Sequence, residues 1–311
     1  MTTTTARKTT RKARPSAATV ERRRAEREQT AAAMQAQLAD RVDALAGSDE
    51  WMRYLDFSRS FHNYSLSNLM LILAQRPDAS QVAGFQQWRA KGRQVRKGER
   101  AIKIYGYSSK KTTETDEATG ETVERKRVFF PILSVFDIAQ TDPIDGHPQP
   151  EHPARRLEGE DPTQIADRVA AVMVARGWNV TREAIPGEVN GYTTTDGSKR
   201  IVIDADLSPA QAAKTAIHEA AHALLHADAD AMPEGMHRGI GEVEAESVAY
   251  VLAGLLGLDT AAYSVGYVTG WAGGDAEKVR DTAGRVLGAV RTLADALGLD
   301  DADESDSEPA A

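Results

Sequence analysis

Apolar residues recur at intervals of three and four along three stretches in the second half of the chain, a spacing that places them on one face of an α-helix. These stretches run from 163 to 176, from 241 to 256 and from 275 to 297. A fourth helix is predicted to begin at Ser208, because Ser208-Pro209-Ala210-Gln211 supplies an N-cap serine, a proline at the first helical position and a glutamine for a capping box. This half of the chain is therefore predicted to be mainly helical.

Alternation of polar and apolar residues predicts strands in both halves. In the first half, residues 101–107 and 129–138 are predicted to be partner strands, with a polar hairpin tip at 110–127. In the second half, two short strands flank Asp196-Gly197, which is a strong signal for a hairpin turn. That hairpin comes just before the helix at Ser208, so it offers an edge strand to which an extended peptide could add. The fold class predicted is α+β.

The helix that begins at Ser208 contains His218, Glu219 and His222 in the pattern H-E-x-x-H. At about 3.6 residues per turn the two histidines fall on one helical face, where two imidazoles can share one zinc ion. Glu219 lies beside them and is placed to take a proton from a metal-bound water. The chain has seven histidines, and three of them lie within residues 218–226, which favours a metal site over a chance pattern.

A catalytic zinc site needs a third protein ligand and one open position for water. The helix predicted at 241–256 offers Glu242 and Glu246, which are one turn apart on a common face. We predict Glu242 as the third ligand and Glu246 as a carboxylate that holds a ligand histidine from behind. Glu246 is also the alternative third ligand.

The spacing gives four other side chains near these motifs no place among the metal ligands. We expect His226 to be a solvated or capping side chain, and Glu244 to be solvated, because it points away from the face that carries the other glutamates of its helix. Tyr250 and Tyr263 are alternative candidates to stabilise an oxyanion, and spacing does not select between them.

The motifs resemble those of a family of zinc peptidases. The strings A-I-H-E-A-A-H-A-L-L-H and E-V-E-A-E-S-V-A-Y are similar to the gluzincin-type ImmA/IrrE-like metallopeptidase domain. Carried over to this chain, the resemblance implies His218, His222 and Glu242 as ligands of Zn²⁺. It implies Glu219 as the general base for hydrolysis of a peptide bond.

Charge is unevenly distributed along the chain, although the formal net charge is −8. Residues 1–29 carry nine Lys and Arg against three Glu, whereas residues 292–311 carry seven acidic residues and no base. Residues 51–111 carry twelve Lys and Arg against three acids, with nine aromatic residues interleaved. Cations beside aromatic rings are what binding of single-stranded DNA requires, because the cations hold phosphates and the rings stack on bases. The alternative for this composition is an aromatic core inside a shell of cations.

The first half also resembles a known domain. From about Trp51 to Thr141, the motifs N-Y-S-x-x-N, G-F-x-x-W, G-R-x-V-R-K-G-E and V-F-D-I-x-Q-T are similar to the N-terminal ArdC-like single-stranded-DNA-binding domain of antirestriction proteins from mobile elements. Followed by a zinc-peptidase-like domain, it has the two-domain order of ArdC-like proteins. The resemblance implies seven residues as DNA contacts: Asn63, Tyr64, Trp88, Lys91, Arg93, Lys97 and Lys103.

The predicted organisation is a small mixed α/β single-stranded-DNA-binding domain and a mainly helical zincin-like metallopeptidase domain with a β-hairpin edge. The boundaries are a disordered basic arm at 1–30, the ArdC-like domain at 31–141, a linker at 142–161, the metallopeptidase-like domain at 162–298 and a disordered acidic tail at 299–311. The chain has no cysteine, which excludes disulfides and thiolate metal sites and fits a reducing cytoplasm. No apolar run approaches about eighteen residues, so we expect a cytoplasmic protein without membrane contact.

Three functions are compatible with these features. The one we expect is a single-stranded-DNA-binding zinc metallopeptidase of the mobile-element antirestriction type, acting on an unknown protein substrate. The second is a non-proteolytic antirestriction module that binds single-stranded DNA and has a structural zinc. The third is a regulatory peptidase that cleaves a repressor. The sequence does not specify the oligomeric state.

Overall fold

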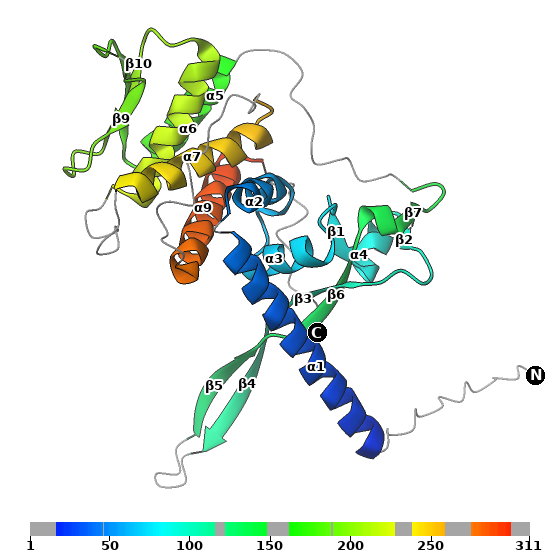
Figure 1. Cartoon of the computed structure of the whole chain (residues 1–311). Helices are drawn as coiled ribbons and strands as arrows, with labels where there is room; N and C mark the ends of the chain where they lie inside the picture. The colour runs from blue at the N-terminus through cyan, green and yellow to red at the C-terminus, as the bar shows by residue number, and fades with distance from the viewer. Residues whose placement is uncertain are drawn as a thin grey trace, which may run out of the picture.

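The computed structural model describes residues 17–45, 47–115, 122–147, 162–187, 189–227, 238–258 and 275–299. Figure 1 shows a helical body, from which a long helix and a β-hairpin project. The described segments combine helices with small sheets, which confirms the predicted α+β class. Among the described helices, none is both long and apolar enough to cross a membrane.

Three helices open the described chain: α1 (Ala17–Ala44), α2 (Ser48–Phe61) and α3 (Leu66–Gln75). Ser65 starts α3 because its hydroxyl accepts a hydrogen bond from the backbone N–H of Asn68. The beginning of α1 corrects one expectation. Residues 17–30 were predicted to belong to a disordered arm, but they are helical, since their Ala, Arg and Glu residues are good helix formers. Residues 1–16 of that arm lie outside the described residues.

A three-stranded antiparallel sheet follows, with strand order β1 (Val82–Gly84), β6 (Ile132–Asp137) and β3 (Ile102–Tyr105). The predicted pairing of segments 101–107 and 129–138 is confirmed. β3 lies at the edge of the sheet, and amide side chains of α3 cover that edge. Asn68 exchanges two 2.8 Å hydrogen bonds with the backbone of Tyr105. Gln75 does the same with Lys103 at 2.8 and 2.9 Å, so the edge is satisfied without another strand.

Shorter elements complete this part of the molecule. They are α4 (Phe85–Ala90), the paired strands β2 (Arg93–Val95) and β7 (Thr141–Pro143), and the 3₁₀ turn η1 (Ile138–Gln140). The segment predicted as a hairpin tip belongs to a longer hairpin. β4 (Ser108–Thr115) and β5 (Thr122–Phe129) pair along their whole described length as a separate two-stranded ribbon. This ribbon is the hairpin that projects in Figure 1.

The second half contains α5 (Pro162–Ala175), β8 (Asn179–Glu183), β9 (Gly191–Thr193), β10 (Arg200–Asp204), α6 (Pro209–Leu225), α7 (Arg238–Leu255) and α9 (Ala276–Leu297). The four predicted helices and the hairpin are confirmed. Ser208 caps α6 by accepting a hydrogen bond from the N–H of Gln211. β8 was not predicted. It pairs in parallel with β10, and the sheet order β8-β10-β9 leaves β9 at an edge.

The hydrophobic core is continuous across the predicted linker. Buried apolar residues of α2 and α3 form one cluster with those of α5, α6, α7 and α9. Two hydrogen bonds cross the same boundary. The indole N–H of Trp51 donates to the hydroxyl of Ser247 at 3.1 Å, and the hydroxyl of Tyr54 donates to the carbonyl of Ala283 at 2.7 Å. α2 therefore packs against the helices of the second half, and Figure 1 shows it beside α7.

Candidate metal centre

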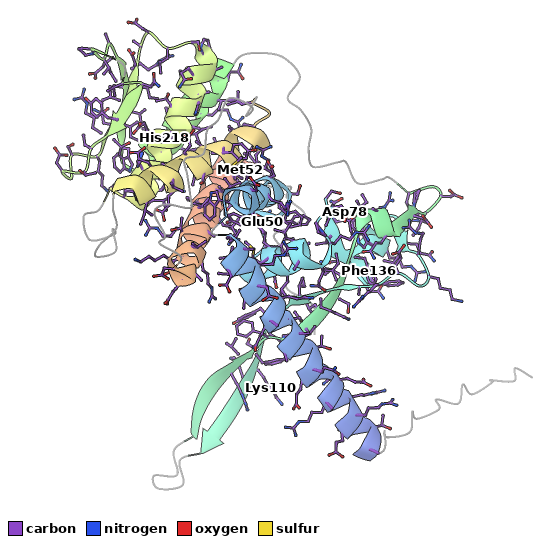
Figure 2. The ribbon with its side chains drawn as sticks, in the orientation of Figure 1. Glu50, Met52, Asp78, Lys110, Phe136 and His218 are labelled. Carbon is purple, nitrogen blue, oxygen red and sulfur yellow. The ribbon has the colours of Figure 1, made fainter. Side chains whose placement is uncertain are left out.

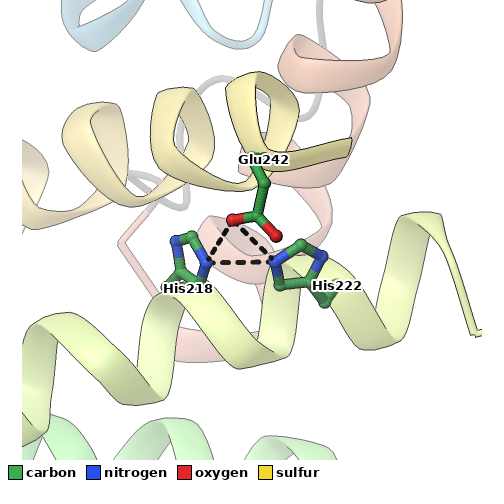
Figure 3. A group of neighbouring side chains, drawn as sticks. All are labelled: His218, His222 and Glu242. Carbon is green, nitrogen blue, oxygen red and sulfur yellow. Dashed lines mark hydrogen bonds and ion pairs between the residues drawn. The ribbon is translucent and has the colours of Figure 1, made fainter. Parts of the chain in front are cut away.

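The two histidines of the H-E-x-x-H motif lie side by side on α6. Small buried alanines, including Ala216 and Ala220, let this helix pack closely in the core while the histidines face the neighbouring helix α7. The Nε2 atoms of His218 and His222 are 3.0 Å apart, and the rings meet edge to face. Figure 3 shows both rings directed towards the same point.

Glu242 of α7 faces the two rings. Its Oε2 lies 3.5 Å from Nε2 of His218 and 3.7 Å from Nε2 of His222. Around a tetrahedral zinc ion with bonds of about 2.0–2.1 Å, neighbouring donor atoms lie about 3.3 Å apart. The three separations of 3.0, 3.5 and 3.7 Å surround that value, so the donor set fits one small cation. The dashed triangle in Figure 3 joins these three atoms.

Glu246 approaches the same site from behind. Its Oε2 is 3.2 Å from Nδ1 of His218, the ring nitrogen that points away from Glu242. Its other oxygen pairs with Nζ of Lys214 at 2.9 Å. A carboxylate in this position would orient a ligand histidine and would not itself bind the metal ion. The structure thus brings Glu242 to the cluster of donor atoms and Glu246 to the far side of the ring.

The carboxylates determine the charge of the metal-free site. Burial lowers the pKa of His218, but hydrogen bonds to Glu242 and Glu246 have the larger combined effect and raise it from 6.5 to about 9. Hydrogen bonds to His218 and His222 hold the pKa of Glu242 well below its usual range. The side chains of His218 and Glu242 therefore hold a proton between them at the place where a cation fits. A metal ion that bound there would release that proton.

Glu219 lies next to the donor atoms but is turned towards strand β9. Its side chain is buried, and its Oε2 accepts a 2.8 Å hydrogen bond from the hydroxyl of Thr193. Burial raises the pKa of Glu219, against the opposing effect of that hydrogen bond. Gly191 lets β9 approach this closely, because a Cβ there would meet the Cγ2 of Thr215 at 2.7 Å and the carbonyl oxygen of Val202 at 2.9 Å.

Neither His226 nor Glu244 is solvated, which corrects the expectation for Glu244. For His226 it excludes the solvated alternative, and His226 is the C-cap residue of α6. His226 is 3% exposed and Glu244 is fully buried, and their side chains meet at 2.7 Å between Nε2 and Oε2. The other ring nitrogen of His226 lies 3.0 Å from Nδ1 of His222. Nε of Arg285, on α9, donates to Oε1 of Glu244 at 2.9 Å. A buried line of polar groups therefore runs from His222 through His226 and Glu244 to Arg285.

Tyr250 does not face the donor atoms. Its hydroxyl donates to Oδ1 of Asp56 on α2 at 2.8 Å, and the guanidinium of Arg59 lies over its ring at 4.4 Å from the centroid. These contacts tie α7 to α2, so this structure does not support Tyr250 as an oxyanion stabiliser. Tyr263 lies outside the described residues.

The seven predicted DNA contacts have different environments. Trp88 was predicted to contact DNA, but its ring is fully buried. Its N–H donates to the carbonyl of Phe136 at 2.8 Å, and no face of the ring is left for a base. Three others are half-buried and bonded within the protein: Tyr64 to the carbonyl of Val82, Arg93 to Thr141 and Lys103 to Ser134. Asn63 and Lys97 are exposed and Lys91 is half-buried.

Comparison with known proteins gives a family match in each half. Residues 26–136 match the N-terminal domain of the anti-restriction factor ArdC. Residues 175–263 match the IrrE N-terminal-like domain of the M78 peptidases. The chain thus combines a match to the N-terminal domain of ArdC with a match to an IrrE-like domain. The second match contains His218, Glu219, His222 and Glu242, and the first contains the basic, aromatic-rich region.

Individual relatives of this chain are distant. An uncharacterized protein of Bacillus anthracis, pXO2-81, is 26% identical over 277 residues, which are 79% of this chain and 47% of that protein. The chain therefore spans about half the length of this curated relative. The metal-free crystal structure of antirestriction ArdC from plasmid R388 is 25% identical with a TM-score of 0.46, covering 76% of this chain and 85% of the other. The Mn(II)-bound structure is 21% identical with a TM-score of 0.47, covering 84% and 96%.

Proposed function

We propose that this protein is a single-stranded-DNA-binding zinc metallopeptidase of the antirestriction type. The observation that carries the hydrolase part is the spacing of the Nε2 atoms of His218 and His222 and the Oε2 of Glu242, at 3.0, 3.5 and 3.7 Å from one another. Two imidazoles and a carboxylate suit zinc, and three protein ligands leave a fourth position open. Glu246 would hold His218 in the orientation that this set requires.

A zinc ion bound there would supply Lewis acidity, which polarises a carbonyl and lowers the pKa of water. Glu219 would take the proton of the attacking water. Its raised pKa suits that role, because a general base works best when its pKa lies near the operating pH. The hydrogen bond from Thr193 would fix which way the carboxylate turns.

The edge strand β9 supports a peptide as the substrate. It ends the sheet order β8-β10-β9, and its residues Gly191 and Thr193 lie against Glu219. An extended peptide that paired with β9 would run past the donor atoms with its backbone ordered by main-chain hydrogen bonds. Such pairing recognises backbone more than side chains, which is compatible with a broad choice of protein substrates.

Charge and shape in the first half support DNA as a partner. Besides the basic composition of residues 51–111, a groove of about 510 Å³ lies between α1 and the start of β3. Its lining is mixed: Ala33, Met34 and Ala101 are apolar, whereas Arg100 and Lys103 lie on one side and Gln29, Thr30 and Gln37 on the other. Cations held beside amide groups can bind a phosphate backbone without reading its sequence.

The peptidase assignment is tested by comparing the wild type with H218A and E219Q. We expect elemental analysis to find about one zinc ion per chain in the wild type and in E219Q, and none in H218A. We expect cleavage of an unfolded protein such as casein, in the presence of single-stranded DNA, only by the wild type. If zinc-repleted wild type binds no metal, the proposal fails. If E219Q cleaves as well as the wild type, Glu219 is not the general base.

The DNA-binding part needs a separate assay. Fluorescence anisotropy with a labelled single-stranded oligonucleotide should show binding that weakens as salt rises, because phosphate contacts release counterions. H218A should bind DNA as the wild type does. If cleavage is absent while DNA binding persists, the protein is a non-proteolytic binding module instead.

A further inference from the structure

An exposed aromatic cluster lies at the base of the β4–β5 hairpin. Phe130 is 65% exposed, and Phe129 and Tyr107 are each 46% exposed. The rings of Tyr107 and Phe130 touch edge to face, with centroids 6.2 Å apart. Exposed single apolar residues are ordinary, but two large exposed rings in contact, with a third on the next residue, mark a candidate binding surface.

Exposed cations follow this cluster along both strands of the hairpin. The register of the two strands places Ser108 opposite Phe129 and Lys110 opposite Arg127. Because side chains alternate between the faces of a strand, Phe129, Lys110 and Arg127 share one face. The same alternation places Tyr107 and Phe130 on the other face, together with the exposed Lys111. Lys110 and Arg127 are both exposed and directly opposite each other, a like-charge pair that is unfavourable unless an anion lies nearby. Figure 2 labels Lys110 at the root of the projecting hairpin.

The backbone beneath the cluster is held firmly to the sheet. The N–H of Gly106 donates to the carbonyl of Pro131 at 2.7 Å. A Cβ at Gly106 would meet Cδ1 of Leu133 at 2.6 Å, so the side chain of Leu133 packs directly against the backbone of Gly106. Tyr107 and Phe130 adjoin Gly106 and Pro131, the two residues that the hydrogen bond joins. Their rings are therefore presented from an anchored backbone, which limits the entropy lost on binding.

We propose that Tyr107 and Phe130 form a stacking platform for the unpaired bases of single-stranded DNA, with Lys110, Lys111 and Arg127 along the two faces of the hairpin holding its phosphates. This rests on the proposed function and gives it a location that none of the seven predicted contacts occupies. Aromatic faces beside cations match a ligand with both π-faces and negative charge. A protein partner with an apolar surface would leave the cation pair unneutralised, and duplex DNA would keep its bases stacked away from the rings.

The test is fluorescence anisotropy with labelled oligothymidylate on the full chain, comparing wild type, F130A and Y107A. We expect each loss of a ring to weaken binding about tenfold, within the range known for base stacking. Y107F and F130W keep a ring and should bind as the wild type does. Y192A is the matched control, because it removes a 39%-exposed ring from β9 in the other half of the chain.

Salt dependence separates the rings from the cations. We expect K110A and R127A each to reduce the slope of log affinity against log salt by about 0.7, and F130A to leave the slope unchanged. Circular dichroism checks that the variants are folded, as expected for exposed positions. If the wild type binds oligothymidylate and both F130A and Y107A bind equally well, the platform is wrong and the proposed function stands. If the wild type does not bind at all, the proposed DNA-binding function fails with it.

Discussion

The Nε2 of His226 lies 2.7 Å from the Oε2 of Glu244, and both side chains are inside the core. The same imidazole reaches the Nδ1 of His222 with its other nitrogen, at 3.0 Å. Glu244 is in turn fixed by Arg285, which also donates to the carbonyl of Leu225 at 2.9 Å. The orientation of His222 is therefore set by groups buried behind it, as that of His218 is by Glu246.

Replacing Glu244 by Gln should weaken zinc binding about 10- to 100-fold, the usual effect of losing an outer carboxylate. The isosteric amide keeps the shape of the side chain but removes the charge that faces His226 and Arg285. Competition with a chelator measures the affinity. E183Q is the matched control, because Glu183 pairs with Arg200 on the exposed side of the sheet, at 2.6 Å. Lower thermal stability of metal-free E244Q with unchanged zinc affinity would make Glu244 a packing residue only.

The substitutions E242Q and E246Q should have different effects on zinc binding. Without the carboxylate of Glu242 the donor set loses a member, so E242Q should retain less than one zinc per chain even in excess metal. E246Q should still bind one zinc per chain, with affinity reduced about 10- to 100-fold because His218 loses its partner at Nδ1. Metal titration followed by elemental analysis distinguishes the two. The opposite pattern would make Glu246 the ligand.

Stability should fall in alkaline solution through Tyr54. Burial raises the pKa of this hydroxyl well above its ordinary value of 10.0, although the hydrogen bond of Ser58 partly opposes that. Below pH 10 the phenol is neutral in both the folded and unfolded states, so its contribution is fully present. Above pH 10 the unfolded chain releases the proton while the folded chain keeps it, and the free energy of unfolding decreases.

Y54F tests this pH dependence. It removes the hydrogen bond to Ala283 and should lower the free energy of unfolding near neutral pH by about 0.5–1.5 kcal/mol. Above pH 10 the difference from the wild type should narrow, because the phenylalanine cannot ionise. Denaturant unfolding at several pH values measures both quantities. A constant difference across that range would contradict the assigned pKa direction.

Two glycine substitutions should have opposite signs. G191A forces a Cβ against Thr215 and the backbone of Val202, and should destabilise the protein by about 1–3 kcal/mol. G288A adds a Cβ to an exposed position of α9 where nothing lies within 4 Å, and should stabilise it by about 0.5–1 kcal/mol. Thermal unfolding of the metal-free protein compares them directly. An unaffected G191A would mean that β9 is free to move away from Glu219.

Local signals in the sequence predicted the helices of the metal site well. The cap at Ser208 and the spacing within α6 and α7 depend on neighbouring residues, so they can be recognised without the fold. The environment of Glu244 could not be, because its partner Arg285 lies 41 residues further along the chain. The helical spacing that places Glu244 on a different face from Glu242 and Glu246 also places it in the core.

Other differences between the predicted and the observed structure also arise from contacts between residues far apart in the sequence. β8 contains a single apolar residue, Val180, and becomes a strand because β10 pairs with it. Trp88 sits among basic residues in the sequence, yet it packs with Ala83 and Val95 in a small core of its own. Composition predicted a basic, aromatic-rich region, but only the fold separates the buried rings from exposed ones such as Phe130.

The helix α7 has partners on either side of the linker, since Glu242 and Glu246 face α6 while Ser247 and Tyr250 contact α2. The two halves are thus not interchangeable modules joined by a tether. Cutting the gene at the linker would leave each fragment with an apolar surface open to water. An exchange of either half with a relative would have to carry matching residues for that surface, so the two halves are expected to evolve as one unit.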